Sequence, residues 1–310
     1  MTNMLESTQR FSTRAVEWAA SKNYIPMADD RFLKMRYERK TGCKLNLEEP
    51  QTFSEKLQWL KLHDRRPEYT IMVDKYAAKQ YVADKIGQKY IIPTMGLWER
   101  YDAVNFDRLP DQFVLKCTHN SGGAIICRNK DEFNKKRAKE LERHLKYNYF
   151  WYGREWPYKH VKPGIIAEVY MEEKPESGAE AYQIQRHDLA DYKFYCFNGA
   201  PMYCQVILNR SVCETIDFFD MEWNHMEFTG LNLPGRAFPK SSVPIPAPSH
   251  LPEMKEKAAV LSYGIPFVRI DFYEVQGAMY FGEMTFYPAS GFGVFEPDEW
   301  NYKMGDLLKL

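Results

Sequence analysis

Two acidic residues near the C-terminus have a spacing that could hold a metal ion. Asp271 follows an apolar run from Phe267, and Glu283 lies in a second run beyond the turn residues 275–278. This pattern predicts a β-hairpin that brings the two carboxylates side by side. Adjacent carboxylates repel unless a cation lies between them, and their hard oxygen atoms suit Mg²⁺ bound to substrate phosphates. The alternative is that both acids only solvate strand ends.

A lysine followed by a glycine-rich loop is the second chemical feature. Lys116 lies in the apolar run 113–117, and the loop 119–123 ends in Gly122 and Gly123. Adjacent glycines let backbone N–H groups approach phosphate oxygens, and phosphate is a natural partner for an ammonium group in an apolar strand. Lys193 repeats the pattern in an aromatic strand. The alternatives are a tight turn and edge-strand lysines that discourage aggregation.

Two further patterns favour a nucleotide site. Arg269 precedes Asp271 by two residues, so strand alternation places both side chains on one face, where the arginine could stabilise a transferred phosphoryl group. The apolar strand 165–170 is followed by acidic residues. Backbone groups at the end of this strand could bind an adenine edge, and an acid beyond it could bind ribose hydroxyls. No histidine pair has a metal-binding spacing, and no serine or cysteine lies in a recognisable nucleophile motif.

Composition limits the class of protein. The chain has 310 residues, with 42 Lys plus Arg and 42 Asp plus Glu, so no overall charge attracts nucleic acid or an anionic membrane. The length suits two or three packed subdomains or one large α+β unit. The six cysteines lack CxxC spacing and are expected to be reduced, mostly in the core. No leader or membrane-spanning run is visible, which predicts a cytoplasmic protein.

The elements that must position these residues fall into four predicted regions. Region 1–66 is helical, region 67–110 is a small α/β segment, region 111–170 carries the glycine loop, and region 171–310 carries the acid pair. Helices are expected at 14–20, 29–37, 52–62, 74–86, 132–147 and 253–263, with Ser54 as a possible cap of the third. Strands are expected at 90–93, 95–98, 112–117, 124–127, 165–170, 193–197, 202–208, 215–219, 267–272 and 280–288.

Two connections and one turn complete this outline. Residues 172–190 are polar and predicted to form a loop, and the proline-rich residues 233–252 are predicted to form a linker. Asn198-Gly199 is a strong hairpin signal between two of the strands. The chain shows no internal repeat.

In this order, the motifs resemble those of ATP-grasp enzymes. Residues 111–123, 153–158, 191–199 and 280–291 are similar to one branch, the TupA-like proteins of teichuronopeptide and surface-polysaccharide biosynthesis. The resemblance covers roughly residues 30 to 310. It implies an α+β fold of three subdomains, in which two antiparallel-rich sheets hold Mg-ATP and the glycine-rich loop acts as a lid.

The resemblance also assigns roles to residues. It implies that Lys116 and Lys193 contact phosphate and that the glycine loop covers the β and γ phosphates. It also implies that residues 168–170 form the adenine-binding hinge and that Glu173 contacts the ribose. The implied ATP-binding residues are Lys75, Lys116, Ser121, Gly122, Gly123, Glu168, Val169, Tyr170, Glu173 and Lys193.

The metal and reaction centre is assigned in the same way. Asp271 and Glu283 would hold Mg²⁺, and Arg269 would approach the transferred phosphoryl group, with Lys193 beside it. Thr285 stands where many ATP-grasp ligases have a metal-binding asparagine. A hydroxyl can still coordinate weakly or through water, so a second metal position stays open.

The resemblance implies a carboxylate–amine ligase that uses ATP and Mg²⁺ and works through an acyl phosphate. The expected substrates are an amino acid or amine and a uronic-acid-containing surface glycan or its precursor. The alternatives are a phosphotransferase acting on a sugar hydroxyl, and a nucleotide-binding module without turnover in a glycan-assembly complex. Arg154, Trp156, Tyr158 and Arg210 could bind the anionic sugar by stacking and ion pairing, although a structural role for the aromatic loop fits equally well.

Overall fold

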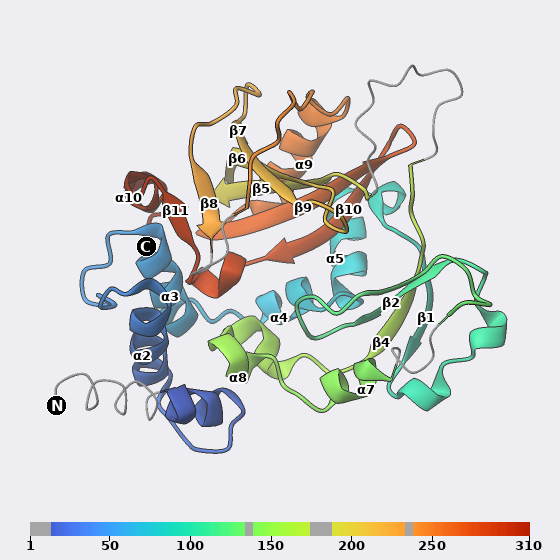
Figure 1. Ribbon diagram of the computed structural model, residues 1–310, viewed down its shortest axis with the longest axis horizontal. Helices are drawn as coiled ribbons and strands as arrows, with labels where there is room; N and C mark the ends of the chain where they lie inside the picture. The colour runs from blue at the N-terminus through green and yellow to red at the C-terminus, as the bar shows by residue number, and fades with distance from the viewer. Residues whose placement is uncertain (1–13, 134–138, 174–187, 233–237) are drawn as a thin grey trace.

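Two antiparallel sheets form the framework of the protein (Figure 1). The computed structural model describes residues 14–133, 139–173, 188–232 and 238–310. A five-stranded sheet lies in the upper part of Figure 1 and a four-stranded sheet in the lower right, with helices packed around both. This arrangement confirms the predicted α+β class.

The five-stranded sheet has the strand order β10-β9-β5-β6-β7. Its strands are β5 (Asp191–Phe197), β6 (Ala200–Leu208), β7 (Thr215–Asp220), β9 (Phe267–Val275) and β10 (Ala278–Thr285). The predicted turn between β5 and β6 is confirmed, because Asn198 and Gly199 have φ values of 51° and 86°. Positive φ at both positions is the geometry of the turns that join twisted antiparallel strands. The central strand β5 is buried along its whole length, which explains its aromatic composition.

The four-stranded sheet has the order β1-β4-β2-β3. Its strands are β1 (Thr94–Trp98), β2 (Phe113–Cys117), β3 (Ile125–Cys127) and β4 (Ile165–Val169). A third, two-stranded sheet pairs β8 (Thr229–Asn232) with β11 (Val294–Glu296), which was not predicted. Since β1 pairs with β4, one sheet combines the predicted regions 67–110 and 111–170. The division into four regions stays a prediction.

Helices surround the sheets. They are α2 (Asp29–Thr41), α3 (Phe53–His63), α4 (Glu68–Val73), α5 (Ala77–Ile86), α7 (Glu140–Leu145), α8 (Phe150–Gly153), α9 (Leu251–Ser262) and α10 (Glu299–Leu307). Residues 14–21 are also helical. Short 3-10 helices are η1 (Gln88–Tyr90), η2 (Tyr101–Ala103), η3 (Phe106–Arg108), η4 (Trp156–His160) and η5 (Pro288–Gly291).

The start of α3 corrects one prediction. Thr52, and not Ser54, is the N-cap: its side chain accepts a hydrogen bond from the backbone N–H of Glu55, and the Glu55 carboxylate accepts one in return. This reciprocal pair is a capping box. Ser54 is instead buried, and its hydroxyl donates to the backbone oxygen of Gly293.

Two other boundaries differ from the prediction. The helix expected from residue 74 begins at Ala77, because the Asp74 carboxylate accepts hydrogen bonds from the backbone N–H groups of Tyr76 and Ala77. The strand expected at 90–93 is reduced to a bridge between Ile91 and Phe281. Part of the helix expected at 132–147, of the loop at 172–190 and of the linker at 233–252 lies outside the described residues.

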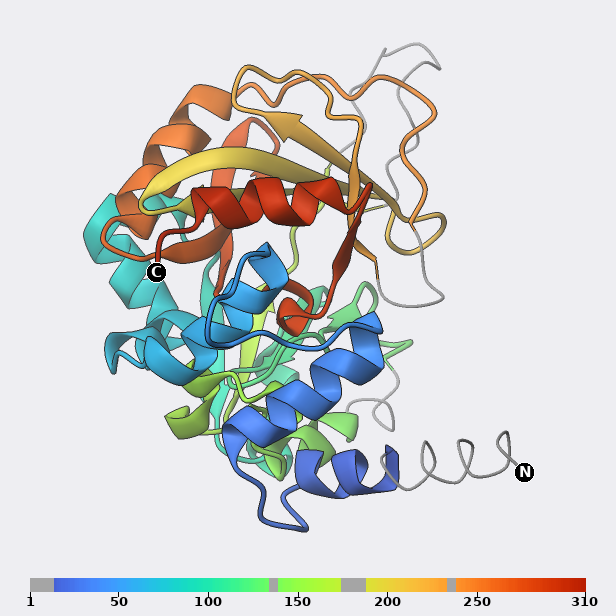
Figure 2. The same cartoon turned by 90° about the vertical axis from the view of Figure 1, so that its left-hand side faces the viewer.

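The main hydrophobic core joins the five-stranded sheet to α3, α4, α9 and α10. Helix α10 lies beside α3 (Figure 2), so the last helix of the chain packs against a helix of its first quarter. The predicted apolar face of α3 is confirmed, since Phe53, Leu57 and Leu60 are buried in this core. A second core lies under the four-stranded sheet, and a third joins α2 to Phe292.

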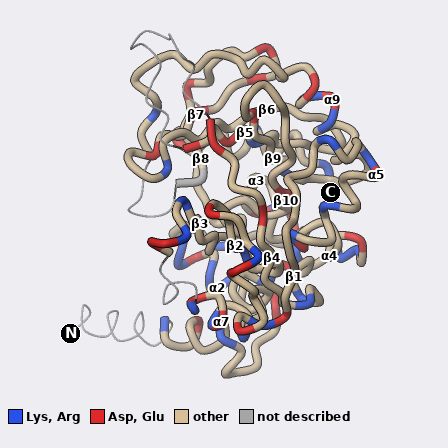
Figure 3. The backbone as a smooth tube through the Cα atoms, turned by 90° about the vertical axis from the view of Figure 1, so that its right-hand side faces the viewer, with Lys and Arg blue, Asp and Glu red and all other residues tan. Residues whose placement is uncertain are grey.

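The distribution of charge and cysteine fits the composition. Basic and acidic positions are interspersed along the backbone trace (Figure 3), with neither sign gathered over one whole side of this view. All six cysteines are free, and four of them are buried, as predicted. Among the described residues, no helix is both long and apolar enough to cross a membrane.

Candidate functional site

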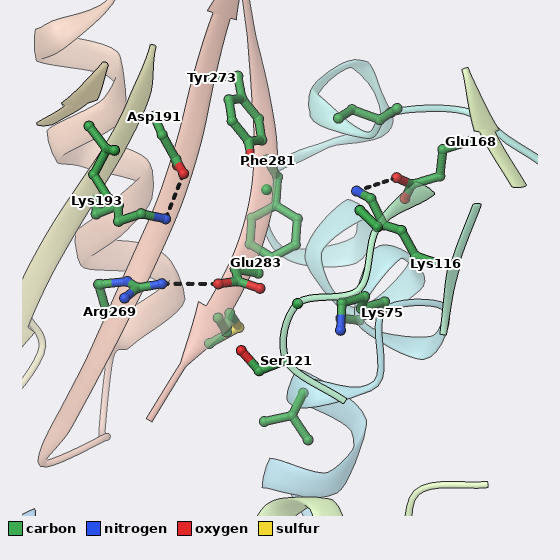
Figure 4. Close-up of a pocket in the computed structure, with 18 of the residues that line it drawn as sticks. Lys75, Lys116, Ser121, Glu168, Asp191, Lys193, Arg269, Tyr273, Phe281 and Glu283 are labelled. Carbon is green, nitrogen blue, oxygen red and sulfur yellow. Dashed lines mark hydrogen bonds and ion pairs between the residues drawn. The ribbon is translucent and has the colours of Figure 1, made fainter. Parts of the chain in front are cut away.

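A cavity of about 400 Å³, called the central cavity here, lies between the two larger sheets. Figure 4 shows basic side chains approaching it from both sides, with Lys75 and Lys116 opposite Lys193 and Arg269. The predicted site residues that line it are Lys75, Lys116, Ser121, Gly122, Tyr158, Glu168, Lys193, Arg210, Arg269 and Glu283. Residues predicted from distant parts of the chain are therefore brought together.

The acid pair of the β9–β10 hairpin lies as predicted. Glu283 is the register partner of Asp271 across the two strands. Arg269 bridges the pair: its Nε and Nη2 donate to the two Asp271 oxygens at 2.7 Å, and Nη2 also donates to Glu283 Oε1 at 2.9 Å. The same nitrogen donates to the Thr285 hydroxyl at 3.0 Å. The strand-end alternative does not fit Asp271, which is fully buried.

Lys193 adds a second cation to this cluster. Its ammonium group pairs with Asp271 and lies 2.8 Å from Asp191 Oδ2. Burial would raise the pKa of Glu283, but the charges of Lys193, Arg269 and Lys75 outweigh it and lower that pKa to about 2. Glu283 therefore faces the central cavity as a carboxylate.

These oxygen donors fit a hard divalent cation. Asp271, Glu283 and Thr285 converge on one point, where the guanidinium of Arg269 now satisfies them. Glu283 is the accessible member, with 39% of its side chain exposed. Mg²⁺ takes one or two carboxylates and completes its shell with water and phosphate, so this donor set is sufficient. Asp271 could serve only if Arg269 and Lys193 moved away from its oxygens.

The glycine loop is held by a lysine in the turn before α5. The backbone N–H of Lys75 donates to Thr118 O at 3.0 Å, and its ammonium group donates to the backbone oxygen of Asn120. Gly122 and Gly123 have φ values of 75° and 74°, a conformation that side chains rarely adopt. Burial lowers the pKa of Lys75. An anion in the central cavity would offset that cost.

Glu168 is the counterion of two lysines on the opposite wall. Its oxygens lie 2.6 Å from Lys116 Nζ and 2.7 Å from Lys79 Nζ. Burial would raise the pKa of Glu168, but these two ammonium groups lower it below its ordinary value. The side chain of Glu168 thus fixes two cations at the edge of the cavity, in addition to the backbone role predicted for residues 168–170.

A neighbouring cavity of about 550 Å³, called the strand-end cavity here, contains three more of the predicted nucleotide residues, whereas Gly123 lines neither cavity. Val169, Tyr170 and Glu173 line it, and it shares Lys116 and Glu168 with the central cavity. The Glu173 carboxylate accepts hydrogen bonds from the backbone N–H of Gln276, in the β9–β10 turn. The two cavities therefore adjoin each other at the end of β4.

The four predicted acceptor residues separate in the structure. Tyr158 and Arg210 line the central cavity, where Arg210 donates to Asp191 Oδ2 at 2.7 Å. Trp156 is half-buried in η4. Arg154 is fully buried, stacks 4.2 Å over the Phe32 ring and pairs with Asp29, so the structure places it in the contact between α2 and α8.

Sequence reasoning missed two residues of this site. Lys79 lies on α5, four residues after Lys75, and i,i+4 spacing in the helix predicted at 74–86 is a signal that could have identified it. Asp191 lies two residues before Lys193 on the same face of β5, and one of its oxygens, Oδ1, is buried without a hydrogen-bond partner.

This combination of two sheets, a glycine loop and an acid pair defines an ATP-grasp fold. The family model for TupA-like ATP-grasp proteins matches residues 55–309. The chain therefore belongs to the TupA-like ATP-grasp family, which confirms the predicted resemblance.

Solved structures with a similar fold are distant. A D-alanine–D-alanine ligase from Bacillus anthracis has a TM-score of 0.41 and 14% identity, over 76% of this chain and 63% of that one. The corresponding ligase from Helicobacter pylori has a TM-score of 0.40 and 15% identity, over 84% and 69%. The ATP-grasp ligase PsnB in complex with a minimal precursor has a TM-score of 0.38 and 9% identity, over 76% and 60%. The chain thus spans less than two thirds of the Bacillus anthracis and PsnB chains. A comparison with curated proteins found no significant match.

Proposed function

We propose that this chain is an ATP- and Mg²⁺-dependent carboxylate–amine ligase. The observation that carries the proposal is one cavity, between two sheets, with Lys75, Lys116, Lys193 and Arg269 around the Glu283 carboxylate. Four cations around a metal-binding acid suit a triphosphate. Membership of the TupA-like ATP-grasp family supports the same substrate.

The proposed reaction has two balanced steps. A carboxylate oxygen of the acceptor attacks the γ-phosphorus of ATP, so that an O–P bond forms, the bond to the bridging oxygen breaks, and ADP leaves. The amine nitrogen then attacks the acyl carbon; a C–N bond forms, the C–O bond to phosphate breaks, and inorganic phosphate and a proton are released. Positioning and charge neutralisation are sufficient for this chemistry, so no protein nucleophile is needed.

Each residue has a defined part in this scheme. Arg269 would stabilise charge on the transferred phosphoryl group, while Lys193 and Lys75 would bind phosphate oxygens. Asp271, Glu283 and Thr285 would hold Mg²⁺, which neutralises phosphate charge when bound. Lys116 and the glycine loop would hold the rest of the triphosphate, and the strand-end cavity would take the nucleoside.

The substrates follow from the family resemblance. We propose a uronic-acid-containing surface glycan, or its precursor, as the carboxylate and an amino acid or amine as the nucleophile. Because the reaction consumes ATP, we expect it on the cytoplasmic side, alongside other proteins of glycan assembly.

Product analysis tests the reaction class. The protein is incubated with Mg-ATP, glucuronate and a panel of amines, and ADP, phosphate and new amides are measured. A ligase forms all three in equal amounts. ADP without free phosphate would indicate a phosphotransferase, and no turnover despite nucleotide binding would indicate a binding module.

A further inference from the structure

A smaller cavity of about 240 Å³, called the acceptor cavity here, adjoins the central cavity. The two share Ser121, Tyr158, Arg269 and Glu283. Arg269 and Glu283 therefore form a wall between the two spaces. A group bound in the acceptor cavity would lie beside the end of a triphosphate bound in the central cavity.

Helix α2 supplies two cations to the acceptor cavity. Arg36 and Lys40 are four residues apart, so they lie on the same side of the helix. Arg36 is only 4% exposed, yet its Nε has no hydrogen-bond partner. The guanidinium lies 3.4 Å from Glu17, 4.3 Å from the Tyr152 ring, and 5.6 Å and 5.5 Å from the Phe32 and Phe292 rings. A buried guanidinium with an unused donor is suited to an anionic ligand.

The cavity continues outward into a groove of about 600 Å³. Ser121, Tyr149 and Tyr152 line both spaces, and the two tyrosine rings stack with centroids 5.8 Å apart and planes inclined by 27°. Lys22 and Arg143 line the outer groove. Stacked aromatic rings offer a broad apolar surface with polar hydroxyl tips, which suits ring-shaped polar ligands.

Positive charge dominates this path. The charged residues that line the acceptor cavity and the outer groove are Lys22, Arg36, Lys40, Arg143 and Arg269 against Glu155 and Glu283. Burial and the nearby charges of Arg39 and Arg36 lower the pKa of Lys40, so a bound anion would relieve repulsion there. The backbone at the far wall is also unusual, because Ala289 and Ser290 both have positive φ values, 49° and 55°. Such conformations are held at binding sites more often than elsewhere.

We propose that the acceptor cavity and the outer groove bind a carboxylate-bearing sugar chain, with Arg36 and Lys40 binding the carboxylate and Tyr149 and Tyr152 stacking on the rings. This assignment rests on the proposed ligase function and names the part of the chain that selects the acceptor. Helix α2 lies before the region matched by the family model, residues 55–309. The acceptor site therefore draws on residues outside the matched family region.

Calorimetric titration with tri-galacturonate tests the proposal, in the presence of Mg²⁺ and a non-hydrolysable ATP analogue. We expect Lys40→Met and Tyr152→Leu to weaken tri-galacturonate binding at least tenfold, and Arg36→Lys to have an intermediate effect. Nucleotide affinity should stay within twofold of the wild type in all three. Lys303→Met, which removes an exposed lysine on α10, is the matched control and should change neither affinity. Arg36 is buried, so its variant could fail to fold. Lys40 is only half-buried and its variant is expected to fold, so the Lys40 variant tests the proposal by itself.

Several outcomes would overturn the acceptor assignment while leaving the ligase proposal intact. In the first, the wild type binds nucleotide normally but does not bind tri-galacturonate. In the second, the Lys40 and Tyr152 variants bind tri-galacturonate as tightly as the wild type. Equal binding of neutral maltotriose would overturn the role of charge, and tighter binding of tri-glutamate would overturn the sugar. If the wild type bound no nucleotide, that result would instead count against the proposed function itself.

Discussion

At the scale of single residues, the site is a set of acids whose counterions are already present. Asp271 and Glu283 share Arg269, and Glu168 is shared by Lys79 and Lys116. Removing one partner from such a pair leaves a buried charge uncompensated, which costs far more than the pair contributes. We expect substitutions of Glu283, which faces the central cavity, to affect mainly turnover, and substitutions of Glu168 to affect mainly stability.

Exchange of Glu283 for Gln should abolish most turnover. The amide keeps the size of the side chain but removes the negative charge that faces the central cavity. We expect kcat/KM for ADP formation to fall about 30-fold or more, which corresponds to about 2 kcal/mol of transition-state stabilisation. Glu256→Gln on the exposed side of α9 is the control. Near-normal turnover in the Glu283 variant would reject the metal-site assignment.

The stability contributed by Glu168 should depend on pH. Its folded pKa is lowered by Lys116 and Lys79 against the opposing effect of burial, so its contribution is present above the unfolded pKa of about 4.3 and is lost as the pH falls below it. We expect Glu168→Gln to lower the free energy of unfolding by about 2–3 kcal/mol at pH 7, since it leaves two ammonium groups without their counterion. Because both lysines are partly exposed, this loss is smaller than that for a fully buried pair. Urea titrations at pH 7 and pH 3.5 measure the difference between wild type and variant. That difference should shrink at pH 3.5, and a constant difference would contradict the electrostatic explanation.

At the scale of elements, α3 and α10 connect the N-terminal helices to the five-stranded sheet. Lys56 on α3 donates to the backbone oxygens of Gly305 at 2.7 Å and Leu308 at 3.0 Å, at the end of α10. Charge-assisted bonds to these terminal carbonyls compensate backbone groups that a helix leaves unpaired. Helix α2 in turn packs on α3 and contributes Arg36 and Lys40 to the acceptor cavity.

Removal of the capping box should weaken α3. Thr52→Ala deletes the side-chain acceptor at the N-cap, and we expect the free energy of unfolding to fall by about 1 kcal/mol. Urea denaturation monitored by circular dichroism measures it. Glu55→Gln is a matched control, since glutamine can fill the same position of the box and should retain most of the stability. An unchanged midpoint for Thr52→Ala would show that tertiary packing alone sets the start of the helix.

Substitution of Gly305 should disturb the packing of α10 on α3. A Cβ at this position would lie 2.2 Å from the backbone oxygen of Gln51 and 3.0 Å from backbone atoms of Thr52 and Phe53. Because the backbone has little room to move, we expect Gly305→Ala to destabilise the protein by about 2 kcal/mol. The neighbouring Asp306→Ala, at an exposed position, should have little effect in the same thermal unfolding assay. Equal stability of both variants would contradict the close helix contact.

At the scale of the whole molecule, the central cavity joins parts of the chain that are far apart in sequence. Its walls come from α4, α5 and the glycine loop on one side and from β5, β9 and β10 on the other. The bridge between Ile91 and Phe281 is a direct backbone link between these parts. A ligand that contacts both walls should therefore tie the two sheets together.

Mg-ATP should stabilise both walls at once. At a concentration 100 times its Kd, a ligand that binds only the folded state adds about 2.7 kcal/mol to the free energy of unfolding. We expect a rise in Tm and slower hydrogen exchange in the glycine loop and in β9–β10. ATP without Mg²⁺ should give a smaller effect. Protection confined to one wall would contradict binding between the sheets.

The sequence by itself determined the features that depend on local periodicity. Strand alternation placed Arg269 and Asp271 on one face, turn residues placed Glu283 opposite Asp271, and Asn198-Gly199 marked a hairpin. These patterns arise between residues that are close along the chain, so they can be read without the fold. The α+β class and the family resemblance followed from the order of such motifs.

Tertiary structure decided which residues from separate elements meet. Glu168 pairs with Lys116 because β4 lies beside β2, where Glu168 is opposite Val114, and it pairs with Lys79 because this residue of α5 reaches the same strand. For Arg154 the sequence left a sugar contact and a structural role equally open. Its packing against Phe32 buries it between helices, whereas Arg36 on α2 reaches the acceptor cavity. Contacts between distant segments depend on the packing of whole elements, and no local pattern in the sequence records which side chain that packing will bury or leave facing a cavity.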